Sequence, residues 1–122
     1  MDGEFIRDIF SAFGPVSVRR MFGGAGIFVD DLMFALIADE MIYLKVDAEN
    51  ARDFEREDLP PFTYAARNRR VELSYRRMPD RLYDDREELR RWAQASLAAA
   101  RRAQATSSGR RARAKARTRT RR

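Results

Sequence analysis

Four short strand-like runs follow one another between positions 16 and 46, and only two or three turn-forming residues separate each run from the next. Two glycines end the first run, and acidic pairs end the second and the third. Connections this short join antiparallel neighbours, because a parallel pair needs a crossover of about a dozen residues or more. The pattern therefore predicts an antiparallel β-meander. We expect its strands at 16–22, 26–29, 32–38 and 41–46.

The run at 32–38 reads LMFALIA and is apolar at every position. Successive side chains of a strand point to opposite faces of the sheet, so both faces of this strand are apolar. Such a strand is typically buried on both sides. We expect either cover from other elements on both faces or a contact between two copies of the chain, and the second alternative predicts a homodimer.

Helical patterns stand on both sides of the meander. Apolar residues recur at spacings of three and four between Phe5 and Phe13, which predicts a first helix that ends at Gly14-Pro15. Asp47 is expected to cap a second, short helix over residues 48–57.

Two more strands and a last helix complete the pattern. The strands are expected at 62–64 and 71–75. Asp84, with Glu87 three positions later, resembles a capping box at the start of the last helix, which we expect to fray near Ala105. The predicted fold class is therefore α+β, with five to six antiparallel strands in the order α-β-β-β-β-α-β-β-α.

The chain has 122 residues and contains neither histidine nor cysteine. This length allows one domain of ordinary size. Without histidine there is no Ser-His-Asp triad and no imidazole base that works near neutral pH. Without cysteine there is no thiolate nucleophile, disulfide or thiolate metal site. These absences point away from an enzyme, and we predict no catalytic residue, no metal site and no cofactor.

Three other patterns have both a functional and a structural explanation. The glycines at 23–26 beside Arg19-Arg20 fit either a phosphate-binding nest or a bend between strands, and the strand pattern that follows them favours the bend. Lys45 is either a buried nucleophile or a solvated group near Asp47. The acidic pairs fit turn chemistry better than a metal site or acid–base catalysis.

Charge is distributed unevenly along the chain. Ten of the 25 basic residues lie in positions 101–122, and no acidic residue follows Glu88. Positions 1–100 therefore hold 15 basic and 19 acidic residues, a net charge of −4, although the whole chain carries +6. Segment 106–122 is basic and nearly free of apolar groups, so we expect a disordered tail after a domain over residues 1–105.

A basic tail attracts polyanions without reading their sequence, since it has no aromatic residue that could stack on bases. We expect either nonspecific contact with DNA or RNA, or a solubilising appendage without a dedicated partner. The residues that would contact nucleic acid are Arg110, Arg111, Arg113, Lys115, Arg117, Arg119, Arg121 and Arg122.

Two motifs stand in the meander: Arg20, Met21, Phe22, Gly23, Gly24 and Gly26, followed by Tyr43, Leu44 and Lys45. This ordered series resembles the N-terminal domain family of TfoX (Sxy), a bacterial competence regulator. Further matching residues bring the resemblance to roughly residues 4–100. It implies a two-layer fold with helices against one side of the sheet. The family offers no catalytic residue to transfer, so the motif residues are expected to be structural.

The resemblance also sets the functional expectation. In TfoX proper a second, helical domain follows, and the whole protein is a co-activator of competence genes, whereas here the Arg-rich tail stands in that place. We expect a bacterial, cytoplasmic, non-catalytic module for transcription regulation or protein interaction, with an unknown regulatory protein as its partner and no membrane partner. The alternative is a nonspecific nucleic-acid-associating protein that acts through its tail.

Overall fold

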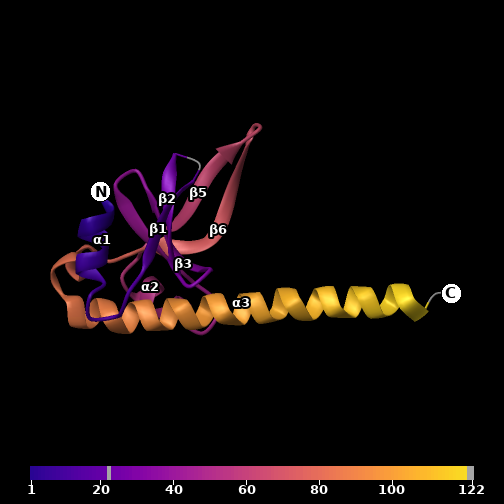
Figure 1. The fold of residues 1–122 in the computed structure, drawn as a ribbon. Coiled ribbons are helices and arrows are strands. Elements are labelled where there is room, and N and C mark those ends of the chain that lie inside the picture. The colour runs from indigo at the N-terminus through magenta and orange to yellow at the C-terminus, as the bar shows by residue number, and fades with distance from the viewer. Residues whose placement is uncertain (22, 121–122) are drawn as a thin grey trace.

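The computed structural model describes the backbone of residues 1–21 and 23–120, and the side chains of residues 1–21 and 23–109. Within this part of the chain, six strands form one antiparallel sheet in the order β1-β2-β3-β4-β6-β5 (Figure 1). The expected α+β class and order of elements are confirmed. The helices are α1 (Gly3–Ile9), α2 (Ala51–Arg56), the 3₁₀ helix η1 (Asp80–Asp84) and α3 (Arg86–Thr120). The strands are β1 (Ser17–Met21), β2 (Gly24–Val29), β3 (Leu32–Ala38), β4 (Met41–Lys45), β5 (Pro61–Ala66) and β6 (Arg69–Arg77).

Helix α1 begins at a capping aspartate. The Asp2 carboxylate accepts a hydrogen bond of 2.8 Å from the backbone N–H of Phe5, which satisfies one free amide of the first turn. The helix ends at Ile9, before Phe13, where the apolar spacing placed its last turn. Gly14 then adopts a φ of +140°, so the change of direction begins in this short connection to β1.

Acidic residues with a left-handed backbone form the tight turns of the meander. Asp39 and Glu40 have φ values of 50° and 62°, as the two central residues of a type I′ hairpin require. Asp30 has a φ of 54° in the preceding turn. These positions suit aspartate because its short polar side chain tolerates the left-handed region. The acidic pairs therefore lie in turns between strands.

A bulge in β3 decides which of its side chains enter the core. Ile27 pairs with Ala35, but the next residue of β2, Phe28, pairs with Met33, so Phe34 is the extra residue. Phe34 and Ala35 are consecutive, yet both are fully buried in the same core. The bulge thus lets two neighbouring residues of one strand serve the same layer.

The core lies between the sheet and the helices, with α3 running across β3 and β4 (Figure 1). The Phe34 ring packs edge-on against Phe10 at 5.7 Å between centroids, and Trp92 of α3 packs against Phe54 of α2 at 4.9 Å. Burial of this apolar layer is the main source of stability. Core side chains without exposed surface include Ile6, Phe10, Ile27, Phe34, Ala35, Ile42, Leu44, Met78, Leu82, Leu89 and Ala93.

The start of α3 differs from the expected cap by one residue. Asp84 is the last residue of η1, so it does not cap the helix. The carboxylate of Asp85 accepts a hydrogen bond of 3.0 Å from the backbone N–H of Glu88 and caps the helix instead. The predicted capping pattern is still present, one residue later. Asp85 and Glu88 are three positions apart, as Asp84 and Glu87 are.

Asp47 does not cap α2, because that helix begins only at Ala51. The side chain of Asn50 fixes the loop before it: its nitrogen donates to the carbonyl of Lys45 at 3.0 Å, and its oxygen accepts from the N–H of Asp47 at 2.8 Å. Both ends of this buried amide are therefore satisfied. The Asp47 carboxylate accepts from the N–H of Glu49 at 3.0 Å and remains in the loop.

Helix α3 does not end near Ala105 but continues to Thr120, so the backbone is helical where a disordered tail was expected (Figure 1). Ser107, Ser108 and Gly109 do not interrupt it. Alanine, arginine, lysine and glutamine are strong helix formers and no proline intervenes, so local propensity supports the extension. Residues 103–108 are exposed. The tail side chains from 110 onward, expected to contact nucleic acid, lie outside the described side chains.

Candidate functional site

An apolar groove of about 710 Å³ lies on the face of the sheet opposite the helices. Leu36 lies on this face because it alternates with Ala35 and Ile37, which belong to the core. Strands and their turns alone line the groove within the described part of the chain. Its main apolar side chains are Met21, Met33, Leu36, Phe62, Tyr64 and Leu73.

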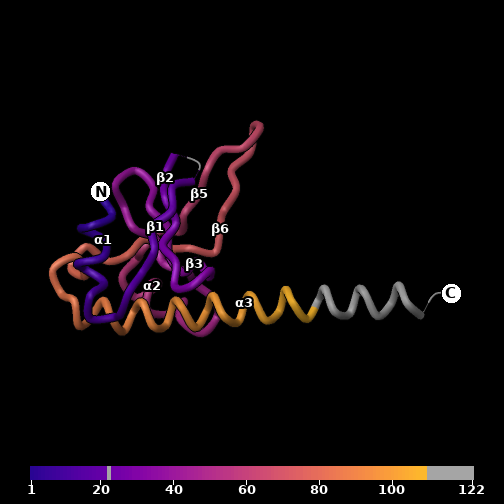
Figure 2. Tube along the Cα trace, viewed as in Figure 1, coloured from indigo at the N-terminus to yellow at the C-terminus, as the bar shows by residue number. Residues whose placement is uncertain are grey.

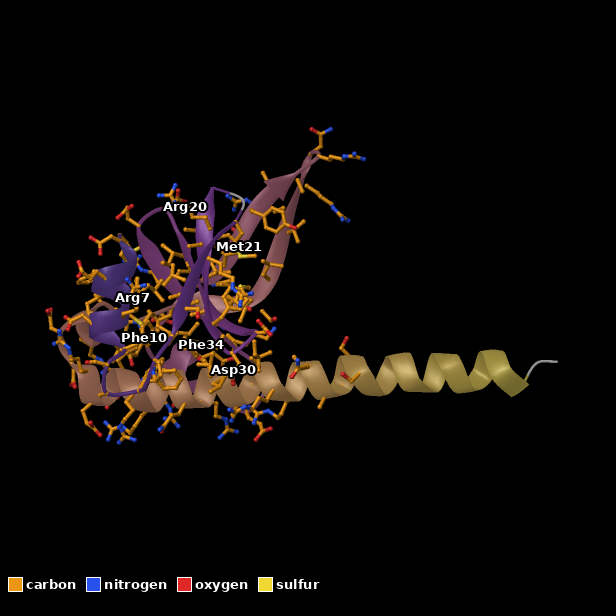
Figure 3. All side chains as sticks on the ribbon, in the orientation of Figure 1. Arg7, Phe10, Arg20, Met21, Asp30 and Phe34 are labelled. Atoms are coloured by element: carbon orange, nitrogen blue, oxygen red, sulfur yellow. The ribbon has the colours of Figure 1, made fainter. Side chains whose placement is uncertain are left out.

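The two walls of the groove differ in chemistry. The meander supplies methionine and leucine side chains, whereas the β5–β6 hairpin supplies aromatic rings. Phe62 packs against Tyr43 at 5.0 Å between centroids and lies 6.3 Å from Tyr64, nearly parallel to it. In Figure 3, Met21 lies on the side of β1 that faces this hairpin. A rigid aromatic wall thus stands opposite a flexible methionine wall.

The glycine-rich segment forms the end of the groove, and its two glycines are required for different reasons. Gly23 has a φ of +77°, which is disfavoured for residues that carry a Cβ. Gly24 lies so close to β3 that a Cβ there would be 2.1 Å from the carbonyl oxygen of Ile37. The segment enters β2 and not a helix, so it is a bend between strands and lacks the helix N-terminus typical of phosphate loops.

The family-motif residues lie on both layers of the molecule. Met21 lines the groove, Leu44 is fully buried in the core, and Tyr43 supports the aromatic wall. Arg20 is exposed on β1, and residue 22 lies outside the described residues. A Cβ at Gly26 would be within 3 Å of the sulfur atoms of two methionines and of the Phe28 ring. The positions of these residues suggest packing roles.

Lys45 lies at the end of β4, outside the groove. Its Nζ donates to the Ser74 hydroxyl at 2.5 Å and lies 5.1 Å from the centre of the Tyr75 ring. Partial burial lowers the pKa of Lys45, and the nearby Asp47 carboxylate opposes that shift. Burial also raises the pKa of Tyr75 to about 12. Lys45 therefore covers the Tyr75 ring rather than opening onto a substrate cavity.

Asp47 pairs with an arginine from α3. The Arg102 guanidinium donates to both carboxylate oxygens of Asp47, from Nε at 2.6 Å and from a terminal nitrogen at 3.0 Å. Its Nε also lies 2.8 Å from Glu49. The hydrogen bond from Arg102 is the main reason that the pKa of Asp47 lies below its ordinary value. Through this pair the loop after β4 is tied to α3.

A second, charged cleft of about 430 Å³ lies between α2 and α3. Arg81 is its central cation and lies 2.6 Å from Glu57, 3.5 Å from Glu88 and 5.8 Å from the centre of the Trp92 ring. Because carboxylates already neutralise this arginine, the cleft is a poor anion site. It links the helices and offers little for a ligand.

The acidic residues do not gather into a metal site. Among the described residues, no group of three or more histidine, cysteine, aspartate or glutamate side chains is placed to hold an ion. In the same part of the chain, no helix combines the length and apolar character needed to cross a membrane.

The groove was not predictable as a site from the sequence. The apolar pattern on both faces of β3 indicated a second covered surface, but it did not show that the β5–β6 hairpin would form the facing wall. The alternation of Val71, Leu73 and Tyr75 with polar residues was the other available pattern. It predicts one apolar face for β6 without saying what that face meets.

Comparison with known proteins then identifies the family. Residues 8–100 match the model of the TfoX N-terminal domain. The chain belongs to the TfoX N-terminal domain family. Protein Sxy from Escherichia coli (strain K12) is 28% identical over 104 residues, which cover 85% of this chain and 50% of that protein. The chain thus spans about half the length of this curated relative. The matched region, residues 8–100, contains every motif residue and the six main apolar side chains of the groove.

Proposed function

We propose that this TfoX N-terminal domain is a non-catalytic regulatory module of the cytoplasm, which controls competence-type gene expression by binding a regulatory protein. The apolar groove opposite the helices carries the proposal. Binding surfaces combine apolar contacts with aromatic and methionine side chains, and this groove has all three. The partner would insert an apolar segment between the methionine wall and the aromatic wall.

The chemistry of the groove supports binding over catalysis. Catalytic sites bring together several titratable or nucleophilic groups around one reacting atom. Among the residues that line the groove, Asp39 is the one with a charged side chain, and it lies in a turn at the edge. Lys45 lies elsewhere and is occupied by Ser74 and Tyr75.

The experiment compares transcripts in cells that make the full chain or one of its variants. Met33→Glu places a charge on the methionine wall of the groove, whereas Gln94→Glu adds the same charge at an exposed position of α3. We expect the wild type and Gln94→Glu to change the same set of transcripts, and Met33→Glu to lose that effect while staying folded by circular dichroism. A Met33→Glu chain that regulates like the wild type would refute the role of the groove.

The second candidate function is nonspecific association with nucleic acid through the tail. It rests on the ten basic residues in positions 101–122 and on the absence of acids after Glu88. Deletion of residues 106–122 separates the two candidates. A groove-based regulator keeps its transcript pattern after the deletion, whereas a tail-based protein loses its effect and shows binding that falls steeply with salt.

The open edges of the sheet at β1 and β5 support a homodimer as a further proposal. Sedimentation velocity over a range of concentrations tests it. A monomer at high micromolar concentration would exclude the homodimer and leave the groove for a different protein.

A further inference from the structure

The β5–β6 hairpin concentrates positive charge on an acidic domain. Residues 61–77 contain five arginines and a single acidic residue, Glu72, a net charge of +4. The other residues of positions 1–100 contain 10 basic and 18 acidic residues, a net charge of −8. The two signs are therefore separated in space within one folded domain, not only between the domain and its tail.

The hairpin extends beyond the rest of the sheet. Strand β4 pairs with β6 only at Tyr75, Arg76 and Arg77, so the remainder of β6 has β5 as its one partner in the sheet. Figures 1 and 2 show this two-stranded ribbon standing away from the other strands and from α3. The ribbon is tightly closed, because Arg67 and Asn68 have φ values of 43° and 68° in its two-residue turn.

The far end of the ribbon carries three arginines, Arg67, Arg69 and Arg70, which we call the arginine tip. All three side chains are exposed. None of them forms an ion pair with any other residue that the structure describes, unlike Arg77, which pairs with Asp80 at 3.2 Å. Side chains that end in nitrogen project outward from this end in Figure 3. The arginine tip therefore presents unneutralised charge at the end of a ribbon that projects from the acidic body (Figure 1).

This arrangement fits a duplex better than an acidic protein. A flat approach would bring the net −8 of the body against the phosphates, whereas contact through a projecting ribbon keeps the body at a distance where salt screens the repulsion. A two-stranded antiparallel ribbon also has the width that the major groove of DNA admits. Arginine forks match phosphate oxygens in charge and geometry. Neither the apolar groove nor the charged cleft includes a residue of the arginine tip in its lining.

We propose that the β5–β6 hairpin is a duplex-binding arm, in which Arg67, Arg69 and Arg70 contact backbone phosphates. The contact is independent of the tail and of the apolar groove at the base of the hairpin. It depends on charge and shape rather than on base sequence, because phosphate contacts carry no direct sequence information.

The test uses the full chain and fluorescence anisotropy with a labelled DNA duplex at several salt concentrations. The arm variant replaces Arg67, Arg69 and Arg70 with glutamine. The control variant replaces three exposed arginines of the body, Arg7, Arg52 and Arg56, with glutamine and so makes the same change in net charge. A third variant replaces the arginine tip with lysines.

We expect the arm variant to bind roughly tenfold more weakly or worse, and its slope of log K against log salt to be shallower by about 2 to 3 than that of the wild type. The control should keep nearly the wild-type slope, and the lysine variant should recover most of it because its charges remain. Equal binding by the arm and control variants would overturn the proposal. Binding of poly-glutamate that depends on the arginine tip, with duplex binding unchanged, would instead assign the tip to an acidic protein.

Discussion

The two faces of the sheet differ in what covers them. On one face the side chains of Ile42 and Leu44 have no exposed surface, because α3 lies across them. On the other face the neighbouring side chains of Met41, Tyr43 and Lys45 stay partly exposed. Helices close the first face, whereas a hairpin arm stands beside the second and leaves a groove. The same strands thus supply stability on one side and a binding surface on the other.

The largest effect that tests this difference comes from neighbouring residues of β4. Leu44→Ala removes a fully buried side chain and should lower the free energy of unfolding by about 2–5 kcal/mol. Tyr43→Ala truncates a partly exposed ring on the other face and should cost about 1 kcal/mol. Denaturant unfolding of both variants measures the two losses in the free energy of unfolding. Equal losses would show that the groove face is as important for stability as the core face.

The glycine bend gives the next largest effect and separates backbone strain from steric contact. Gly23→Val and Gly24→Val should each lower the free energy of unfolding by about 1–3 kcal/mol, the first through its left-handed φ and the second through contact with β3. Gly23→Asn should recover most of the loss because asparagine tolerates that φ. Gly24→Asn should recover none, since any Cβ meets the Ile37 carbonyl. Thermal melts that rank the two asparagine variants equally would contradict this assignment.

The fold was predictable because short stretches of sequence determine its turns. Two-residue connections rich in acids and glycine fixed the order and direction of β1 to β4, and the structure keeps each of these strands to within two residues. Helix caps were less predictable, since Asp84 and Asp85 offer the same pattern one residue apart. Only the formation of η1 decides between them.

Contacts between distant segments were not predictable in this way. The groove requires Met33 and Phe62 to lie on facing walls, and no local pattern links these positions. The length of α3 was not predictable because two local signals compete. The low apolar content of the tail favours disorder, whereas its residues have a strong helix propensity, and the helix continues to Thr120. The positive charge of the hairpin was visible in the sequence, but its separation from the acidic body depends on the tertiary fold.

A smaller effect concerns the covered face and comes from a buried hydroxyl on α3. Ser96 is fully buried, and its Oγ has no hydrogen-bond partner among the described residues. Ser96→Ala should therefore raise the free energy of unfolding by about 1 kcal/mol. The substitution removes the cost of transferring an unpaired hydroxyl from water into the core on folding. Ser108→Ala, at an exposed position of the same helix, should change little. A destabilised Ser96→Ala chain in denaturant unfolding would show that the hydroxyl is satisfied.

The smallest effect tests how firmly α3 is held over the covered face, and it depends on pH. The hydrogen bonds from Arg102 keep the pKa of Asp47 below its ordinary value of 3.8, so folding favours the charged carboxylate. The resulting stability is present above the pKa of the unfolded state and is lost as pH falls through the lower pKa of the folded state. Because the Arg102 side chain is 39% exposed, solvent screens the pair and its contribution to the free energy of unfolding should be small.

Thermal melts of the wild type, Arg102→Gln and the exposed control Arg101→Gln between pH 7 and pH 2.5 measure this contribution. We expect Arg102→Gln to melt about 1–3 °C below the wild type at pH 7, and the difference to shrink as the pH falls through the lowered pKa of Asp47. Carboxylates away from Arg102 are common to the three proteins, so the difference between the proteins reports on the ion pairs that Arg102 forms. A gap between Arg102→Gln and the wild type that stays constant over this range would mean that Arg102 holds α3 by packing of its aliphatic stem, and that charge contributes nothing to closing the covered face.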